Sequence, residues 1–450
     1  MSQDRHDLTR GSPLRQLVAF STPVMVANLL QTSYQLVDSL WVGNLLGAAA
    51  LGAVAVSGTV VFTVLSFVIG MNSAALTILS QQRGRQDEDG LRRYLNACVV
   101  TLFTLSLGRG LAGFLAADPL LDLLGTPGSI AAEATDYLRI TFLGMLFLFG
   151  YNFLSTVLRA LGDSRTPMRF VLMAVVLNAV LDPLLIEVLR LGIRGAAYAT
   201  VLSQGVAFLY GLVHVRRRRL APFQVPTPPT WTETRTILHL GIPAGLQMAV
   251  ISGGSAAIMS VVTDFGGEVV GGFGAAQRLD ALIMLPAQAL GISVSSMAGQ
   301  NIGARQWERV GRIARVAVRY NLAVMVTVAL VIVVLAEPAV ALFVREPGAV
   351  SFGAGYLRVV ALCYPFLGIN FVLNGVVRAA GAMYQVLALN VISFWVLRFP
   401  LTALCAHWLG ETGIGVGIGA SFVVSSACAY LYFRFGRWRE RTLFDAPVRR

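Results

Sequence analysis

The stretch VLMAVVLNAVLDPLLIE (residues 171–187) decides how the rest of the chain is interpreted. It is an apolar run interrupted by Asn178 and Asp182, which lie four residues apart and therefore on one face of a helix. A carboxylate inside a membrane helix costs about 2.5–3.5 kcal/mol on insertion scales, so it usually faces a protein interior or a wet cavity and handles ions or protons. The alternative is that Asp182 lies near a helix end, reaches the headgroups and has no role.

Composition places the chain among multi-pass membrane proteins. Its 450 residues are 56% hydrophobic and 13% charged, whereas soluble domains carry about 25% charged residues. The net charge of +12 does not indicate a nucleic-acid partner. The arginines cluster instead in short loops between apolar spans, where positive charge sets membrane orientation.

We expect an all-α protein with twelve transmembrane helices, because about 20 apolar residues are needed to cross a bilayer. The predicted spans are 15–38, 50–80, 93–117, 131–159, 168–190, 195–215, 236–263, 269–298, 313–336, 351–379, 384–408 and 413–435. The loops on one side carry most arginines, and the alternate loops hold Arg109, Arg190, Arg194 and Arg345. This asymmetry predicts a cell-membrane protein with cytoplasmic N- and C-termini.

One long polar connector, RRRRLAPFQVPTPPTWTET (216–234), divides the spans into two groups of six. Pro-rich segments of this kind favour extended chain. The predicted domains are a cytoplasmic tail (1–13), an N-lobe (14–215), the cytoplasmic linker (216–234), a C-lobe (235–436) and a second cytoplasmic tail (437–450).

The two predicted lobes are repeats of each other. Tyr137-Leu138-Arg139 recurs as Tyr356-Leu357-Arg358, and Gly162 recurs as Gly381, in each case 219 positions later. Because six spans separate equivalent residues, both lobes have the same orientation. Parallel repeats are related by an axis along the membrane normal, and substrate then tends to bind at their interface. Alternating access by rocking of the lobes is the hypothesis that follows.

Polar residues of the N-lobe are expected at one depth in the membrane. Asp38 lies near the outer end of the first span, Asp182 in the outer half of the fifth, and Tyr137 and Thr200 near the outer ends of the fourth and sixth. Asn178 lies one turn deeper. Two carboxylates in one low-dielectric pocket should not both be ionised without a cation, so one would hold a proton or the pair would bind Na⁺.

The acid pair is not repeated in the C-lobe, where the equivalent positions are Ala257 and Leu401. Asp280 and Arg398 are the remaining charges at membrane depth, and they either line a cavity or neutralise each other as a structural pair. The methionines of the spans suit an adaptable binding surface, but they are equally typical of lipid-facing filler. The candidate residues of a substrate cavity are Gln31, Tyr34, Met248, Asp280 and Met284.

Pro23 interrupts the first span about four turns before Asp38. A proline inside a helix removes a backbone hydrogen bond and kinks it. The kink either responds to protonation at Asp38 or is static, and the sequence favours neither reading.

Four strings of the sequence resemble the multidrug and toxic compound extrusion (MATE) family. They are DSLWVG (38–43), LSTVLRALGDSRTPM (154–168), NAVLDPLLI (178–186) and GQNIGA (299–304). The resemblance covers almost the whole chain. It implies two six-helix bundles related by pseudo-two-fold symmetry, arranged in a V around a central cavity. It also implies a secondary antiporter that exports organic, often cationic and lipophilic, drugs in exchange for H⁺ or Na⁺.

The resemblance also implies site residues. Carried over by motif, the cation site comprises Asp38, Tyr137, Asn152, Asn178, Asp182 and Thr200, and the bending proline is Pro23. Ser252 stands near the position where the NorM-type branch has an acid in its seventh span, and the tenth span has none. The resemblance therefore favours the DinF-like branch and H⁺ coupling.

Two other functions compete with drug export. A flippase for a lipid-linked oligosaccharide would have more than twelve spans and a basic cavity, and the acids Asp38 and Asp182 argue against it. An enzyme or receptor would need a nucleophile, a metal cluster or a soluble domain, and the four cysteines and four histidines have no ligand spacing. We expect a monomer whose partners are small-molecule drugs or toxins and the bilayer, with no cofactor beyond the coupling ion.

Overall fold

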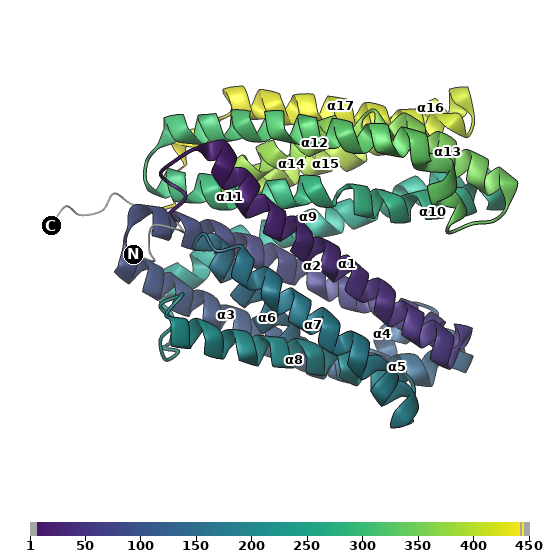
Figure 1. Ribbon diagram of the computed structural model, residues 1–450, viewed down its shortest axis with the longest axis horizontal. Coiled ribbons are helices and arrows are strands. Elements are labelled where there is room, and N and C mark those ends of the chain that lie inside the picture. Colours follow the sequence, from purple (N-terminus) through teal and green to yellow (C-terminus); the bar gives the residue numbers. More distant parts are fainter. Residues whose placement is uncertain (1–6, 442, 445–450) are drawn as a thin grey trace. The chain divides into compact units, whose positions relative to one another are not determined.

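The structure is a computed structural model that describes residues 7–441 and 443–444, and these residues form helices with no strand among them (Figure 1). The helices are α1 (Pro13–Leu46), α2 (Ala48–Arg85), α3 (Glu88–Leu115), α4 (Ala117–Leu123), α5 (Gly128–Leu143), α6 (Met145–Ala160), α7 (Arg165–Pro183), η2 (Leu184–Val188), α8 (Ile193–Arg218), α9 (Trp231–Thr263), α10 (Gly267–Ile283), α11 (Leu285–Gly303), α12 (Trp307–Ala341), α13 (Pro347–Ala361), α14 (Tyr364–Ala379), α15 (Met383–Val391), η3 (Ile392–Arg398), α16 (Phe399–Leu409), α17 (Thr412–Phe435) and η4 (Arg437–Glu440). The all-α prediction is confirmed. The predicted tails lie partly outside the described residues.

Length and composition identify the membrane spans. Within the described chain, nine helices are long and apolar enough to cross a membrane, or eleven if each of two bent pairs is one span. The 34-residue helix α1 is not among them, which accounts for the difference from the predicted twelve. Its apolar sequence is interrupted by Gln31, Tyr34 and Asp38. A polar helix of this kind needs protein partners within the membrane.

Two predicted spans are bent instead of continuous. The span predicted at 131–159 divides into α5 and α6 with a bend of 48°, and that at 351–379 divides into α13 and α14 with a bend of 54°. Gly144 lies at the first bend, where a side chain would clash with Val201 of α8. The second bend lies at Cys363, 219 positions after Gly144, and Pro365 follows it in the first turn of α14. The bend is therefore a property of both repeats.

Two π-helical segments lie beside the polar residues of the fifth and eleventh predicted spans. Asp182 and Pro183 end α7 directly before η2, and Arg398 ends η3 just before Pro400. A proline has no backbone N–H to donate to the helical hydrogen-bond pattern. Short π-helical segments within α-helices are frequent at functional sites. Both charged side chains thus lie where the regular backbone pattern changes.

The chain divides into two compact units, and two helices are shared between them. Unit 1 contains Val26–Ile242, and unit 2 contains Leu8–Met25 and the chain from Pro243 onward. The divisions fall inside α1 and α9, at Pro23 to Met25 and at Pro243. Each shared helix therefore has its proline within two residues of the division.

The first half of α1 belongs to the core of unit 2. Leu17, Phe20 and Val24 are buried in a cluster that includes side chains of α11, α12 and α14, together with the fully buried Trp438 after α17. Apolar packing therefore fixes this half-helix to unit 2, although it precedes unit 1 in sequence.

Hydrogen bonds fix the segment before α1 to the same unit. The Leu8 N–H donates to Gln300 (3.1 Å), and Asn301 donates to the Leu8 carbonyl (3.0 Å). Arg309 donates to the Gly11 carbonyl and to the Gln16 side chain, each at 2.9 Å. Two residues of the GQNIGA motif thus bind the beginning of the described chain.

Unit 1 holds the equivalent segment of the second repeat. Residues 222–230 have no helix, and Thr227 lies 219 positions after Leu8. Asn96 of α3 donates to the Thr227 carbonyl (2.8 Å) and accepts from its N–H (3.0 Å). The segment before each shared helix is therefore bound by an asparagine side chain of its own unit.

Candidate cation site

Three polar residues of α1 and α7 are buried in unit 1. Relative exposure is 8% for Asp38, 1% for Asn178 and 0% for Asp182. Asn178 and Asp182 are one turn apart on α7, and the Asn178 amide donates to Asp182 Oδ1 at 3.1 Å. The Asp182 carboxylate lies within electrostatic range of Asp38. The two acids predicted to converge are thus brought together.

Helix α8 supplies hydroxyl groups to the same cluster. Thr200 lies beside both Asp38 and Tyr34. The Tyr34 and Ser203 hydroxyls are 3.2 Å apart, and Ser203 donates to the Thr200 carbonyl at 3.0 Å. Tyr34, predicted only as a cavity residue, therefore lies against the carboxylate site, and Ser203 is a member that the sequence did not single out.

Tyr137 of α5 completes the cluster. Its ring is buried and lies within electrostatic range of Asp38, Asp182 and Tyr34. Four elements, α1, α5, α7 and α8, therefore contribute to one site in unit 1.

Several oxygen atoms of the cluster are buried without a hydrogen bond from any described residue. They are Asp38 Oδ1, Asp182 Oδ2, Asn178 Oδ1 and Thr200 Oγ1. A buried acceptor without a donor costs about 1–3 kcal/mol, more for a charged group. Carboxylate, amide and hydroxyl oxygens are also the ligands that hard cations prefer. These four oxygens could therefore hold H⁺ or serve as ligands to Na⁺. Within the described chain, no group of three or more His, Cys, Asp or Glu side chains could hold a metal ion.

Other predicted residues have weaker connections to the site. The Asn152 amide donates to the Leu148 carbonyl of its own helix α6, at 2.8 Å. Gln31 is half-buried on α1, one turn before the cluster residue Tyr34. The roles predicted for both stay predictions.

The remaining cavity candidates lie in unit 2. Met248 is half-buried on α9, and Met284 packs against a buried apolar cluster. Asp280 accepts hydrogen bonds from Tyr356 (3.0 Å) and Tyr364. Tyr356 is the repeat equivalent of Tyr137, so the 219-residue offset was the signal that could have found it.

Arg398 lies in the same unit but does not form a direct ion pair with Asp280 among the described residues. Its Nε atom donates to Ser421 (3.2 Å), and its guanidinium lies over the rings of Phe394 (3.8 Å) and Phe422 (4.7 Å). Asp280 and Arg398 interact at longer range. The two charges are balanced through tyrosine, serine and aromatic partners instead of a salt bridge.

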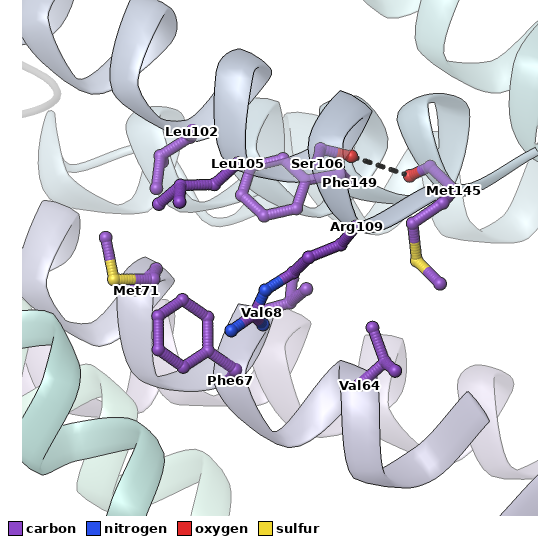
Figure 2. Close-up of a pocket in the computed structure, with 10 residues that line it drawn as sticks. All are labelled: Val64, Phe67, Val68, Met71, Leu102, Leu105, Ser106, Arg109, Met145 and Phe149. Carbon is purple, nitrogen blue, oxygen red and sulfur yellow. Dashed lines mark hydrogen bonds between the residues drawn. The ribbon is translucent and has the colours of Figure 1, made fainter. Parts of the chain in front are cut away.

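A separate small pocket lies between α2, α3 and α6, and Figure 2 shows its mainly apolar lining with the side chain of Arg109 in its middle. The Arg109 guanidinium lies 3.6 Å from the centre of the Phe67 ring, and Ser106 donates to the Met145 carbonyl at 3.4 Å. Assigning Arg109 to a loop was wrong, because it lies within α3. Its aliphatic stem packs on apolar surface while its charge finds an aromatic face.

Comparisons with known proteins agree with this architecture. A profile of the MatE family matches residues 23–184 and 243–404, so each match begins at one of the two prolines near the unit divisions. "Probable multidrug resistance protein YpnP" of Bacillus subtilis is 60% identical over 98% of this chain and 99% of its own length. "Probable multidrug resistance protein YoeA" of the same organism is 29% identical over 97% and 96%.

A solved structure has the same fold. The crystal structure of the Vibrio cholerae MATE transporter VcmN in the bent form matches with a TM-score of 0.91 and 24% identity, over 96% of this chain and 99% of that chain. The match confirms the two-lobe membrane fold. With the family profile covering both repeats and a relative at 60% identity, the chain belongs to the MatE family, the multidrug and toxic compound extrusion transporters that its motifs resemble.

Proposed function

We propose that this transporter exports organic, often cationic and lipophilic, compounds in exchange for H⁺ or Na⁺ bound at Asp38, Asn178, Asp182 and Thr200. The observation that carries the proposal is the set of buried oxygens from α1, α7 and α8 that lack donors among the described residues. The names of the Bacillus relatives support drugs as the substrate class.

The geometry supplies a reason for coupling. Two buried carboxylates repel each other when both are ionised, and a bound cation removes that repulsion. Asp38 lies in the half of α1 that belongs to unit 1, whereas the first half of the same helix belongs to unit 2. A change of charge at Asp38 therefore acts on a helix that both units share, with Pro23 close to the division. Loading and release of the cation would thus bias alternating access.

The test is substrate uptake by everted membrane vesicles with pH and Na⁺ gradients imposed separately. We expect Asp38→Asn and Asp182→Asn to reduce gradient-driven uptake to the background of vesicles without the protein. Asp122→Asn is the matched control, because it makes the same chemical change at an exposed position of α4. Gradient-driven uptake that survives in Asp38→Asn would remove this site from the mechanism, and the gradient that drives wild-type uptake identifies the ion.

The alternative function, a flippase for lipid-linked oligosaccharide, is less well supported. The buried charge of unit 1 is acidic, and the relatives described above are named for drug resistance. We further propose that the protein acts as a monomer in the cell membrane with both chain ends in the cytoplasm. The arginine distribution supports this orientation.

A further inference from the structure

Unit 2 has a second polar feature far along the chain from the acid cluster. A cavity of about 320 Å³ lies where α12 is followed by α13. Its charged lining side chains are Glu337, Arg345 and Arg358, and Ser351 adds a hydroxyl group. None of these residues belongs to the candidate cation site.

The two arginines of this cavity are loosely held. Arg358 reaches Glu337 at 3.5 Å and the Val333 carbonyl at 3.4 Å, both long for charge-assisted hydrogen bonds. Arg345 is exposed and has no hydrogen bond or ion pair with a described residue. The lining therefore carries two positive charges and one negative charge, and its arginine donors are largely unused. Glu346 and Glu268 lie near the start of α13 but do not line the cavity.

In the first repeat, the equivalent charged residues are bound closely to each other. Arg139 and Asp118 lie 219 positions before Arg358 and Glu337, and their ion pair is 2.6 Å long. Thr135 also donates to Asp118, at 3.0 Å. The carboxylate and the guanidinium of the first repeat are therefore used by the protein itself.

Two substitutions between the repeats open the second copy. Ala354 replaces Thr135, so Glu337 loses the equivalent hydroxyl donor, and Ala354 lines the cavity. Arg345 replaces Thr126, whose hydroxyl donates to the Leu121 carbonyl at 2.7 Å. One change removes a side chain that would fill the space, and the other adds a positive charge. The second repeat thus has a longer ion pair, one more arginine and a cavity suited to an anion.

The surface beside the cavity indicates the source of that anion. Exposed apolar side chains lie on α12 directly before Glu337 and in the turn after the helix: Leu330, Val331, Val334, Leu335, Leu342 and Phe343. A membrane helix with such a face contacts acyl chains. An amphiphile can therefore lie along α12 with its charged end in the cavity.

We propose that this cavity binds the phosphate of an anionic phospholipid headgroup, with Arg345 and Arg358 as its ligands. Guanidinium groups bind phosphate through paired, charge-assisted hydrogen bonds. Ser351, which also lines the cavity, can donate a further hydrogen bond. Acyl chains of the same lipid would cover the exposed apolar face of α12.

The test is native mass spectrometry of the purified protein titrated with phosphatidylglycerol. We expect Arg345→Gln to weaken retention of the lipid by about tenfold or more, the loss of one charge-assisted interaction. Ala354→Thr changes no charge but restores the residue of the first repeat, and we expect it to weaken retention as well. Arg169→Gln, which removes an exposed arginine of α7, should retain the lipid as the wild type does.

Two outcomes overturn the proposal. If Arg345→Gln and Ala354→Thr both retain phosphatidylglycerol at the wild-type level, the cavity is not a headgroup site. A parallel titration with inorganic phosphate in detergent distinguishes the source. Phosphate binding that depends on Arg345, without Arg345-dependent lipid retention, would assign the cavity to the free anion instead.

Discussion

At the scale of single residues, equivalent tyrosines serve two different charge environments. Tyr137 in unit 1 lies near two carboxylates, whereas Tyr356 in unit 2 donates to Asp280, which also interacts with Arg398. The unit 2 cluster contains one acid and one base, so its charges already balance. The unit 1 cluster is left with a negative charge that a cation must cancel. Uptake of the coupling ion is therefore expected in unit 1.

The hydroxyl of Thr200 provides a prediction at this scale. Thr200→Val keeps the shape of the side chain but removes the oxygen beside Asp38. An interaction between a hydroxyl and a charged group contributes about 1.5–3 kcal/mol, so its loss should shift the concentration of the coupling ion for half-maximal transport by about tenfold or more. The concentration should rise if the ion is Na⁺, which loses a ligand oxygen. It should fall if the ion is H⁺, because the hydroxyl favours the ionised form of Asp38. Vesicle uptake over a series of ion concentrations measures this shift. Thr200→Ser keeps the hydroxyl and should behave as the wild type; equal shifts in both variants would contradict the prediction.

The acids and several of their neighbours could be predicted from sequence, but the partners Ser203 and Tyr364 could not. Asp38 and Asp182 stand out because a carboxylate in an apolar helix is costly, so its presence needs a reason. Ser203 and Tyr364 do not stand out, since hydroxyl side chains are common in membrane helices and bond readily to many partners. The hydrogen-bond partner of each hydroxyl depends on packing between helices that are distant in sequence.

At the scale of elements, helix α1 connects the site to the other unit. Its second half carries Tyr34 and Asp38, and its first half packs in the core of unit 2. Gln300, Asn301 and Arg309 of unit 2 bind the segment directly before the helix, and Arg309 also binds Gln16 in its first turn. The sequence predicted the helix and its proline but not this division. The sequence pattern shows that residues of α1 are apolar, but it does not show in which of the two bundles they are buried. That is decided by how the helices pack.

Arg309 is the residue that tests this attachment. Arg309→Met should remove its hydrogen bonds to Gly11 and Gln16 and increase hydrogen exchange of the backbone amides in residues 8–16. Arg312→Met removes an exposed arginine of the same helix, and exchange in that segment should be unchanged. Hydrogen-exchange mass spectrometry of the full chain measures both. Equal protection in the two variants would show that the hydrogen bonds of Arg309 do not hold this segment in place.

At the scale of the whole molecule, the repeat was visible in the sequence but the exchange of half-helices was not. A constant offset of 219 residues reveals two copies, because it recurs at separated motifs such as Tyr137 and Gly162. The copies nonetheless differ in charge, as Asp38 and Ala257 show. In the structure, Leu8–Met25 packs in unit 2 and Trp231–Ile242 packs in unit 1. The constant offset does not predict this exchange. That arrangement makes each unit incomplete without chain from the other side of the linker.

Splitting the chain in the linker tests this interdependence. The fragment 1–225 lacks Ile237 and Leu240, which are buried in unit 1, and the fragment 226–450 lacks Leu17 and Phe20 of unit 2. Each lost set leaves a gap in a packed core, which destabilises it by about 2–5 kcal/mol for each large side chain. Expressed alone, each fragment should accumulate in the membrane to well below the level of the intact protein. Expressed together, they should copurify through a tag on one fragment and restore uptake by vesicles. Intact protein cleaved at an inserted protease site after Val225 is the matched control and should keep its Tm. A fragment that is stable alone, with the Tm of the intact chain, would show that the shared half-helices are dispensable to the units that contain them.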